Sequence, residues 1–336
     1  MKRIYNLKRY CDITRMMCGK SKVIDLILSR LIMKVPYNLY VDYCFYNKKW
    51  SLRKDYIIDD LKYFFQYNPG VTKNNHDDKR DIIKKYLPYL HRKILLDTSD
   101  MKLSEFKKFV EDIDSFFYKP FDGDGGAGIQ KFMCKNVEIA CLYENIKKLK
   151  PGLLEETIKQ HKEMNRLNPD AVSTLRITVF KHKNGPRIVF STLRTSSKKG
   201  SVVDNASSGG CFANVDIESG EVCRNAYSEC IAIKTITKEC IRLLSFEGIE
   251  THPLTGVRFK GFKIPFYKES LEMVLEISNN IDFYGRKLIG FDVAITDNGP
   301  VIVEVNANRP DITDLLQTAC KDMPMKSYIE NIFAED

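Results

Sequence analysis

The sequence predicts an α+β fold, in which antiparallel hairpins and amphipathic helices occupy separate stretches of the chain. Apolar and polar residues alternate through 173–195 around Asn184-Gly185, a pair typical of a tight turn, and this pattern predicts a first hairpin. Two β-branched runs within 291–305 flank Asp297-Asn298-Gly299-Pro300 and predict a second hairpin. Residues 265–279 instead carry apolar side chains at helical spacing, which predicts a long amphipathic helix.

The composition is that of a globular protein with a substantial core. The chain has 336 residues, 43% of them hydrophobic and 29% charged, enough for one large domain or two to three small ones. No apolar run approaches the roughly 20 residues of a membrane helix, and the charged start does not resemble a signal peptide. The ten cysteines form no Cys-x-x-Cys pair and do not cluster with the five histidines, so neither a zinc site nor a disulfide framework is predicted. We expect reduced thiols and a cytoplasmic location.

Positive charge is concentrated at the N-terminus. Residues 1–34 contain nine Lys or Arg against two Asp, whereas the formal net charge of the whole chain is +9. Such a segment can contact an anionic membrane surface or a polyanionic substrate, or it can be a solvated helix face. We expect a basic, mostly helical region over 1–75, with one helix at 23–33 and another at 55–67.

The middle of the chain contains short elements separated by polar turns. The polar run 72–78 is the predicted boundary after the N-terminal region. The elements predicted beyond it are a helix at 78–90, a strand at 93–97, a helix at 104–112, a strand at 115–120, a strand at 129–135, a strand or short helix at 136–149, and a short strand from 152 that runs into a polar, helix-like piece ending at 161.

Four glycines lie within the six residues 123–128, between two predicted strands. Such a loop brings backbone N–H groups close to phosphate oxygens. The pattern matches Gly-x-Gly-x-x-Gly, but a dinucleotide-binding fold requires a helix after the loop, and 129–135 alternates like a strand. The sequence also lacks the protein-kinase catalytic signatures and the Gly-Lys-Ser/Thr of a P-loop. A flap over a nucleotide and a plain mobile hairpin turn remain, and Lys119 at the base of the loop favours the flap.

The second hairpin carries two carboxylates that can meet. A three-residue loop at 297–299, with Gly299 in the left-handed conformation, would place Asp292 opposite Glu304 with their Cβ atoms roughly 5 Å apart. Facing carboxylates repel each other unless a cation lies between them, and hard oxygen ligands suit Mg²⁺. A two-residue turn at Asn298-Gly299 would turn the two side chains to opposite faces. The hairpin alone leaves both registers open.

Two arginines lie on the polar face of the first hairpin. Arg176 lies between Thr174 and Thr178 on one strand, and Arg194 lies on the next. An arginine among hydroxyl groups is suited to a phosphate oxygen or a carboxylate, and a cross-strand ion pair is the alternative for either residue. No Gly-x-Ser-x-Gly or His-Glu-x-x-His motif occurs, which argues against serine hydrolase and zinc peptidase chemistry.

Together these features resemble the ATP-grasp superfamily. The shared features are a lysine at a strand end before a glycine-rich hairpin, the connector Leu153-Leu154-Glu155-Glu156, and a late hairpin with Asp and Glu-x-Asn. The sequence is most similar to the sugar-transfer-associated ATP-grasp family found with cell-surface polysaccharide genes, over roughly 78–310. That similarity rests on the runs 173–176, 203–205, 209–210, 252–253, 264–265 and 290–306, and on Gly256.

The resemblance implies an ATP-grasp fold, with the nucleotide held between two α+β subdomains beside the helical N-terminal region. The small subdomain would span 76–155 and carry the flap, and the large one would span 156–336 and carry the metal-binding hairpin. The residues implied for the nucleotide are Lys119 and, with a weaker match, Lys79 at the phosphates, Gly125, Gly126 and Gly128 in the flap, and Glu155 and Glu156 where the connector meets the adenine.

The resemblance also implies a metal and an acceptor site. Asp292, Glu304 and Asn306 would hold Mg²⁺, and Arg176 and Arg194 would face the transferred phosphoryl group or the acceptor carboxylate. One run, 306–311, differs from the more usual glycine-containing tail of the family, which puts the expected acceptor contacts there in doubt.

From these parts we expect an ATP- and Mg²⁺-dependent carboxylate–amine ligase. A substrate carboxylate would attack the γ-phosphate, and the resulting acyl phosphate would lose phosphate to an amine or a similar nucleophile. By family analogy, the acceptor is a sugar acid or an amino acid destined for a cell-surface polysaccharide. The alternatives are phosphotransfer to a non-carboxylate acceptor and a nucleotide-binding module without turnover.

The expected partners are therefore a small-molecule or sugar-acid acceptor and an amine donor, without nucleic acid. Residues 1–34 add a peripheral contact with a membrane or a polyanion, so the cytoplasmic location extends to the inner membrane surface.

Overall fold

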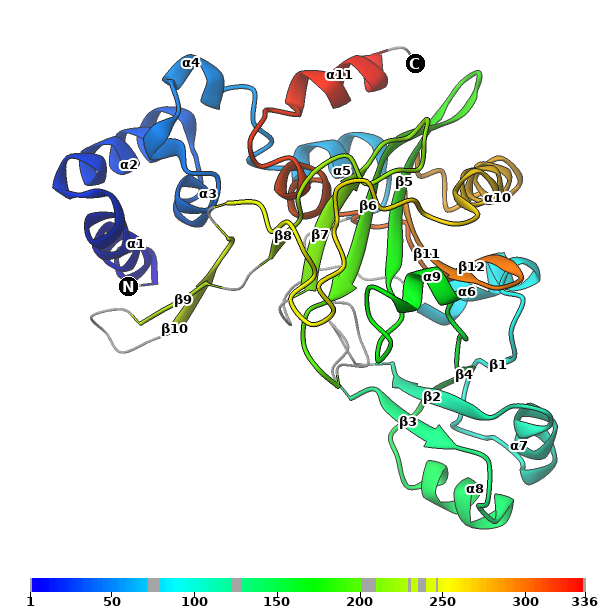
Figure 1. The fold of residues 1–336 in the computed structure, drawn as a ribbon. Coiled ribbons are helices and arrows are strands. Elements are labelled where there is room, and N and C mark those ends of the chain that lie inside the picture. The colour runs from blue at the N-terminus through cyan, green and yellow to red at the C-terminus, as the bar shows by residue number, and fades with distance from the viewer. Residues whose placement is uncertain are drawn as a thin grey trace.

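The computed structural model of the protein describes residues 2–71, 79–121, 128–200, 210–228, 231–234, 240–245 and 247–334. They form two antiparallel sheets with helices around them, a separate two-stranded hairpin, and a helical N-terminal region (Figure 1). This architecture confirms the predicted α+β class. No helix among the described residues has both the length and the apolar character needed to cross a membrane.

The helices are, in chain order, α1 (Lys2–Cys18), α2 (Lys20–Met33), α3 (Tyr37–Asp42), η1 (Phe45–Asn47), α4 (Trp50–Arg53), α5 (Leu61–Tyr67), α6 (Lys79–Tyr86), η2 (Leu87–Tyr89), α7 (Leu103–Val110), α8 (Ile139–Lys147), α9 (Lys162–Asn165), α10 (Tyr267–Asn280), η4 (Thr313–Gln317) and α11 (Lys326–Ala334). The strands are β1 (Ile94–Leu95), β2 (Ser115–Pro120), β3 (Gln130–Met133), β4 (Gly152–Glu156), β5 (Thr174–His182), β6 (Gly185–Ser196), β7 (Gly210–Val215), β8 (Tyr227–Ser228), β9 (Ile231–Lys234), β10 (Cys240–Leu243), β11 (Leu288–Thr296) and β12 (Gly299–Asn306).

The large sheet joins the two predicted hairpins. Its six strands lie in the order β12-β11-β5-β6-β7-β8. The first predicted hairpin is β5–β6 and the second is β11–β12. Because β11 also pairs with β5, with Asp292 opposite Arg176, the polar faces of the two hairpins form one continuous surface.

Different elements cover the two faces of the large sheet. Period two sends Leu175, Ile177 and Val293 to one face, where they share a core with residues of α10. On the other face, α5, η4 and α11 pack around Phe180. The opposite end of that second face carries the charged side chains of the candidate site.

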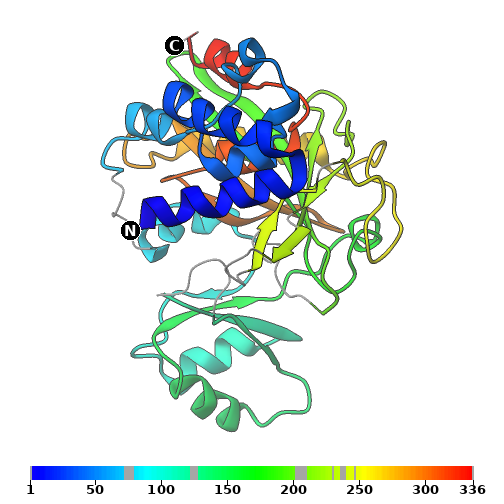
Figure 2. The same ribbon diagram turned by 90° about the vertical axis from the view of Figure 1, so that its left-hand side faces the viewer.

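The small sheet has the strand order β1-β4-β2-β3 and packs against α7 and α8. Its core centres on the buried residues Phe106, Phe116, Ile146 and Leu154. This sheet and its two helices form a separate lobe below the large sheet in both ribbon views (Figures 1 and 2). The β2–β3 hairpin brackets the predicted flap, and residues 122–127 of that flap lie outside the described part of the chain.

The N-terminal helices form two groups. Helices α1–α3, together with Phe45 and Tyr56, build an aromatic-rich core of their own. Helix α5 packs on the large sheet instead, and Asn68 at its end is buried against two strand ends. The Asn68 Nδ2 donates to the carbonyl oxygens of Leu288 (2.8 Å) and Ala307 (3.0 Å). These bonds fix the end of α5 beside the start of β11 and the end of β12.

Several predicted boundaries differ from the observed ones. The helix predicted at 55–67 begins only at Leu61, whose N–H donates to the Asp59 side chain (3.0 Å). The residues before it are not helical, and there the backbone N–H of Ile57 donates to the Gln317 side chain (3.0 Å). The polar piece ending at 161 is extended and not helical, because it runs beside the tip of the β11–β12 hairpin. There the N–H of His161 donates to the Ile295 carbonyl (2.7 Å).

Candidate active site

The β11–β12 hairpin places Asp292 directly opposite Glu304, which confirms the predicted pairing of the two carboxylates. Thr296 pairs with Gly299, so the turn consists of residues 297–298 and Gly299 has a φ of 113°. Both predicted turns, the three-residue loop and the Asn298-Gly299 pair, are therefore wrong. The observed turn alone would bring Val303 opposite Asp292.

A β-bulge at Val303 restores the pairing. Val293 lies opposite Ile302, whereas its neighbour Asp292 lies opposite Glu304, so β12 contains one residue more than β11 over this interval. The extra residue turns Glu304 to the face that Asp292 occupies. Hairpin and bulge together build the two-carboxylate arrangement.

Asp292 is buried at the centre of an ion-pair network. Its Oδ1 accepts from Arg176 Nε (2.6 Å) and Arg194 Nη1 (2.9 Å), and its Oδ2 accepts from Arg176 Nη2 (3.1 Å) and Asn306 Nδ2 (3.4 Å). Burial alone would raise the pKa of Asp292, but the charges of Arg176 and Arg194 lower it to about 2. The structure thus realises for both arginines the cross-strand ion pair that the sequence left open as the alternative.

Arg176 is held on the side away from Asp292 as well. Its Nη1 donates to the Pro310 carbonyl (2.9 Å), and its side chain is only 5% exposed. Gly290 makes this packing possible, because a Cβ at that position would lie 2.8 Å from Pro310 Cβ and 3.2 Å from Arg176 Cδ. With these contacts Arg176 orients Asp292, whereas Arg194 lies nearer the surface. The contact with substrate that was predicted for Arg176 stays a prediction.

Glu155 forms a second buried network between the two sheets. Glu155 lies directly opposite Phe117 on β2 and Ile94 on β1. Lys119 comes two residues after Phe117, and Arg92 comes two residues before Ile94, so both cations lie near Glu155. Both cations pair with the Glu155 carboxylate, Arg92 with its Nε at 3.0 Å. Burial alone would raise the pKa of Glu155, but these two charges lower it to about 2.

Arg92 connects this network to the hairpin. Besides pairing with Glu155, the Arg92 guanidinium donates to the carbonyl oxygens of Ile302 and Val303, the latter at 3.3 Å. These two carbonyls belong to the peptide groups on either side of the bulged residue. Arg92 was not among the predicted site residues. Its partners lie 63 and more than 200 residues away along the chain, so no local pattern marks it.

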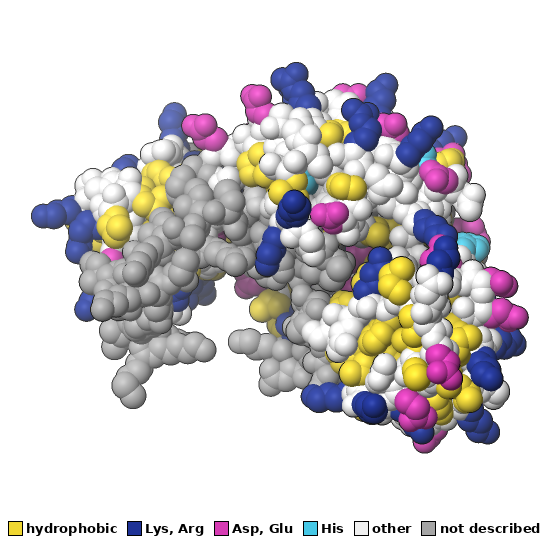
Figure 3. All heavy atoms as spheres, turned by 60° about the horizontal axis from the view of Figure 1, so that its bottom comes forward, with side chains coloured by type: hydrophobic (Ala, Val, Ile, Leu, Met, Phe, Trp, Pro, Cys, Tyr) yellow, Lys and Arg dark blue, Asp and Glu magenta, His cyan; other side chains and the backbone are white. Residues whose placement is uncertain are grey.

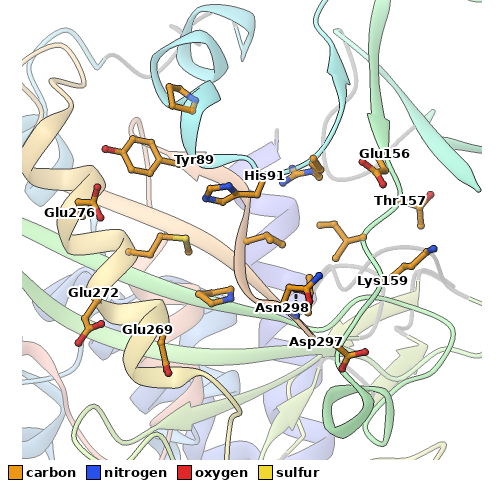
Figure 4. A pocket seen from close by; sticks show the side chains of 17 residues that line it. Tyr89, His91, Glu156, Thr157, Lys159, Glu269, Glu272, Glu276, Asp297 and Asn298 are labelled. Atoms are coloured by element: carbon orange, nitrogen blue, oxygen red, sulfur yellow. Dashed lines mark hydrogen bonds between the residues drawn. The ribbon is translucent and has the colours of Figure 1, made fainter. Parts of the chain in front are cut away.

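Glu156 faces the opposite way from Glu155. It lines a hollow of about 990 Å³ between η2, the connector after β4, α10 and the hairpin tip. Figure 4 shows Glu269, Glu272 and Glu276 of α10 around this hollow, with Glu156 on the connector side. Asp292, Glu304 and Lys119 are not among its lining residues. The two glutamates predicted at the adenine therefore point to different sides of the connector, as alternation along a strand requires.

The remaining predicted nucleotide residues are only partly described. Gly128 has a φ of 78°, the left-handed conformation that glycine adopts without strain, at the end of the flap. Gly125 and Gly126 lie outside the described residues, and so does the Lys79 side chain, although the backbone of Lys79 opens α6. Lys119 lies on β2 at the base of the flap, as predicted.

The donor atoms beside Asp292 fit Mg²⁺ better than a transition metal. The described residues contain no cluster of three His, Cys, Asp or Glu side chains able to hold a metal. Glu304 is exposed on the same face as Asp292, and Asn306 adds an amide oxygen two residues along. An exposed carboxylate and an amide oxygen suit a magnesium ion that keeps several waters and binds substrate phosphates. Both Asp292 oxygens accept from Arg176, Arg194 and Asn306 in this structure.

A model of the family described as sugar-transfer associated ATP-grasp matches residues 60–322, beyond both ends of the predicted range. No curated protein matches the chain. Among solved structures it is similar to the ATP-grasp ligase PsnB complexed with minimal precursor (11% identity, TM-score 0.38, 77% of this chain and 60% of that one). It is also similar to D-alanyl-alanine synthetase A from Vibrio cholerae (12%, 0.39, 77% and 64%) and L-amino acid ligase from Bacillus licheniformis (10%, 0.37, 70% and 41%).

The chain spans 41% to 64% of the length of these three solved structures. The family model, in contrast, covers well over half of the chain itself and includes both sheets, the flap and the carboxylate hairpin. The protein therefore belongs to the sugar-transfer associated ATP-grasp family, and its fold is the ATP-grasp fold of ATP-dependent ligases.

Proposed function

We propose that the protein is an ATP- and Mg²⁺-dependent ligase that joins a carboxylate to an amine or similar nucleophile through an acyl phosphate. The observation that supports this most is the pairing of Asp292 with Glu304 on one face of the hairpin, beside buried arginines and above the lobe that carries Lys119 in Figure 1. Membership of the sugar-transfer associated family supports an acceptor that is a sugar acid or an amino acid used in a cell-surface polysaccharide.

Each part of the site has a proposed task. Glu304, Asn306 and Asp292 would hold Mg²⁺, which when bound neutralises phosphate charge and polarises the phosphoryl group. Lys119 would exchange its contact with Glu155 for phosphate oxygens, while Arg92 keeps Glu155 compensated. Arg194 would face the transferred phosphoryl group or the acceptor carboxylate, while Arg176 fixes the Asp292 carboxylate.

The flap has a protective task in this proposal. Acyl phosphates react with water, so the reacting groups must be shielded while the nucleophile arrives. Gly125, Gly126 and Gly128 would let the loop that follows Lys119 in the chain close over the phosphates. The connector would present the adenine site through its backbone and Glu155, whereas Glu156 lies on the far side.

Hydroxylamine trapping tests the proposal. The protein is incubated with ATP, Mg²⁺, hydroxylamine and a panel of uronic acids and amino acids, and hydroxamate and ADP are measured by mass spectrometry. We expect a hydroxamate with at least one acid, and a loss of about 100-fold or more in the Glu304→Gln variant, by analogy with removal of one charge-stabilising group. A phosphorylated product without hydroxamate would contradict the ligase and favour phosphotransfer to a hydroxyl. ATP binding without ADP release for any acceptor would favour a module without turnover.

A further inference from the structure

Helix α2 presents four apolar residues to solvent, whereas Asp25, Leu26 and Ser29 face the protein. Residues 24, 28, 31 and 32 share one face of the helix, at the spacing that normally marks a buried stripe. Yet the exposed fractions are 65% for Ile24, 41% for Leu28, 70% for Leu31 and 66% for Ile32. We call these four side chains the α2 stripe. Met16, at the end of α1, is 61% exposed as well.

Polar contacts hold the opposite face of α2 in place. Asp25 accepts hydrogen bonds from Tyr40 Oη (2.7 Å), Trp50 Nε1 (2.8 Å) and Arg53 Nη1 (3.0 Å). Arg53 also donates to the buried Ser29 hydroxyl (2.9 Å). Burial alone would raise the pKa of Asp25, but hydrogen bonds from Arg53, Tyr40 and Trp50 lower it overall.

These contacts fix the orientation of the helix. Rotating α2 to bury its stripe would break the hydrogen bonds of Asp25 and Ser29. The buried Arg53 would then lose its carboxylate partner, and a buried charge without its partner is strongly destabilising. The stripe is therefore exposed by construction. A contiguous exposed apolar face on a helix is typical of a surface that binds another protein or a membrane.

The charge around the stripe indicates which kind of partner the stripe binds. Lys20 and Lys34, at the two ends of α2, are exposed, and so are Lys8 and Arg15 on the neighbouring α1. Residues 1–34 hold nine Lys or Arg against two Asp. Figure 2 shows α1 and α2, in dark blue, at the front of the molecule. These helices lie at the left-hand end of Figure 1, and the left-hand end of Figure 3 shows basic side chains beside hydrophobic ones.

We propose that α2 docks on an anionic lipid bilayer, with the α2 stripe in the headgroup–acyl boundary and the surrounding lysines and arginines on the lipid phosphates. An exposed apolar stripe bordered by basic residues, on a helix too short to span a bilayer, is the pattern of interfacial binding. The basic residues select an anionic surface over a neutral one. This inference is independent of the proposed ligase function, because it concerns attachment and not turnover.

Vesicle co-sedimentation of the full chain tests the proposal. Vesicles of phosphatidylglycerol and phosphatidylcholine are compared with vesicles of phosphatidylcholine alone. We expect binding to the anionic vesicles only. The stripe variant, Ile24→Gln, Leu28→Gln, Leu31→Gln and Ile32→Gln together, should bind about 100-fold more weakly, because glutamine keeps the helix but not the apolar surface. Lys20→Gln with Lys34→Gln should weaken binding about 25-fold, since each cation near an anionic surface contributes about fivefold.

A matched control carries the same number of glutamines at exposed apolar positions far from α2, namely Met133, Val137, Ile139 and Leu254. It should bind anionic vesicles like the unaltered chain, and circular dichroism should show all variants folded. Three results would each overturn the proposal: no binding of the unaltered chain to anionic vesicles, full binding by the stripe variant, or equal loss in the control. A fourth is self-association of the unaltered chain in sedimentation velocity, abolished by the stripe variant, because the stripe would then serve a second copy of the chain.

Discussion

Removing Arg92 should weaken the junction between the two lobes. The Arg92→Met change keeps most of the side-chain length and deletes the guanidinium that joins Glu155 to the Ile302 and Val303 carbonyls. Glu155 would keep Lys119 as its remaining cation in the described structure. The two carbonyl oxygens at the bulge would lose the donor that Arg92 supplies.

The magnitude follows from burial. The Arg92 and Glu155 side chains are 5% and 7% exposed, so solvent screens their interaction poorly. Breaking a buried pair by removing one partner costs about 3–5 kcal/mol. Lys119 reduces that cost, whereas the lost bonds to the two carbonyls add about 1 kcal/mol each. We therefore expect Arg92→Met to lower the free energy of unfolding by about 3–5 kcal/mol.

Urea unfolding followed by far-UV circular dichroism measures this change at neutral pH. Arg80→Met is the matched control, because Arg80 pairs with Asp97 at 2.5 Å but both side chains are 36% exposed, and an exposed pair contributes about 0–1 kcal/mol. Adding Glu155→Gln to Arg92→Met should recover part of the loss, because no carboxylate then needs compensation. Two results would show that Arg92 does not join the lobes as described: a loss for Arg92→Met no greater than for Arg80→Met, or a Glu155→Gln effect that is the same with and without Arg92.

Three further predictions concern the hairpin and the two buried carboxylates. Glu304→Gln should reduce ATP turnover by about 100-fold and change the free energy of unfolding by less than about 0.5 kcal/mol, because Glu304 is exposed. Asp292→Asn should reduce both turnover and stability, since it removes the buried carboxylate with which Arg176 and Arg194 both pair. Equal stability of the two variants in urea would contradict this. The pKa values of Asp292 and Glu155 are each lowered to about 2, so their contribution to stability is complete above roughly pH 4–5 and lost as the pH falls towards 2. Urea titrations should show the free energy of unfolding falling from pH 6 to pH 2, and falling less in Asp292→Asn and Glu155→Gln. The same fall in these variants as in the unaltered chain would contradict the prediction. Gly290→Ala should lower the melting temperature by several degrees, because the added Cβ would lie 2.8 Å from Pro310. Gly185→Ala is the control for the backbone effect of a positive φ, because nothing lies within 4 Å of a Cβ there. Equal losses in the two variants would argue against the Pro310 contact.

Alternation along strands made much of the fold predictable. The strands around Arg176 and Arg194 and the strand before the flap follow from period-two patterns and turn residues. The pairing of Asp292 with Glu304 does not, because it depends on the bulge in β12. The same alternation places Glu155 and Glu156 on opposite faces. The sequence therefore held the information that only one of these side chains could point into the site.

Other features depend on contacts that no local pattern encodes. Val303 is an ordinary β-branched residue, and nothing in its neighbourhood marks it as the site of a bulge. Arg92 acquires its role from partners on two distant strands. Hydrophobic periodicity located α2 correctly but cannot tell which face is buried, because the Asp25–Arg53 pair decides that.

The bulge at Val303 gives the hairpin two interchangeable ways of building the same pair of carboxylates. A tip lengthened by one residue and a strand shortened by one residue would bring Asp292 and Glu304 together again, with a regular ladder between them. Relatives could therefore differ in tip length without losing the pair, provided that the two changes occur together. A lone insertion or deletion on either side would swing Glu304 behind the sheet, so gaps in this hairpin should come in matched pairs.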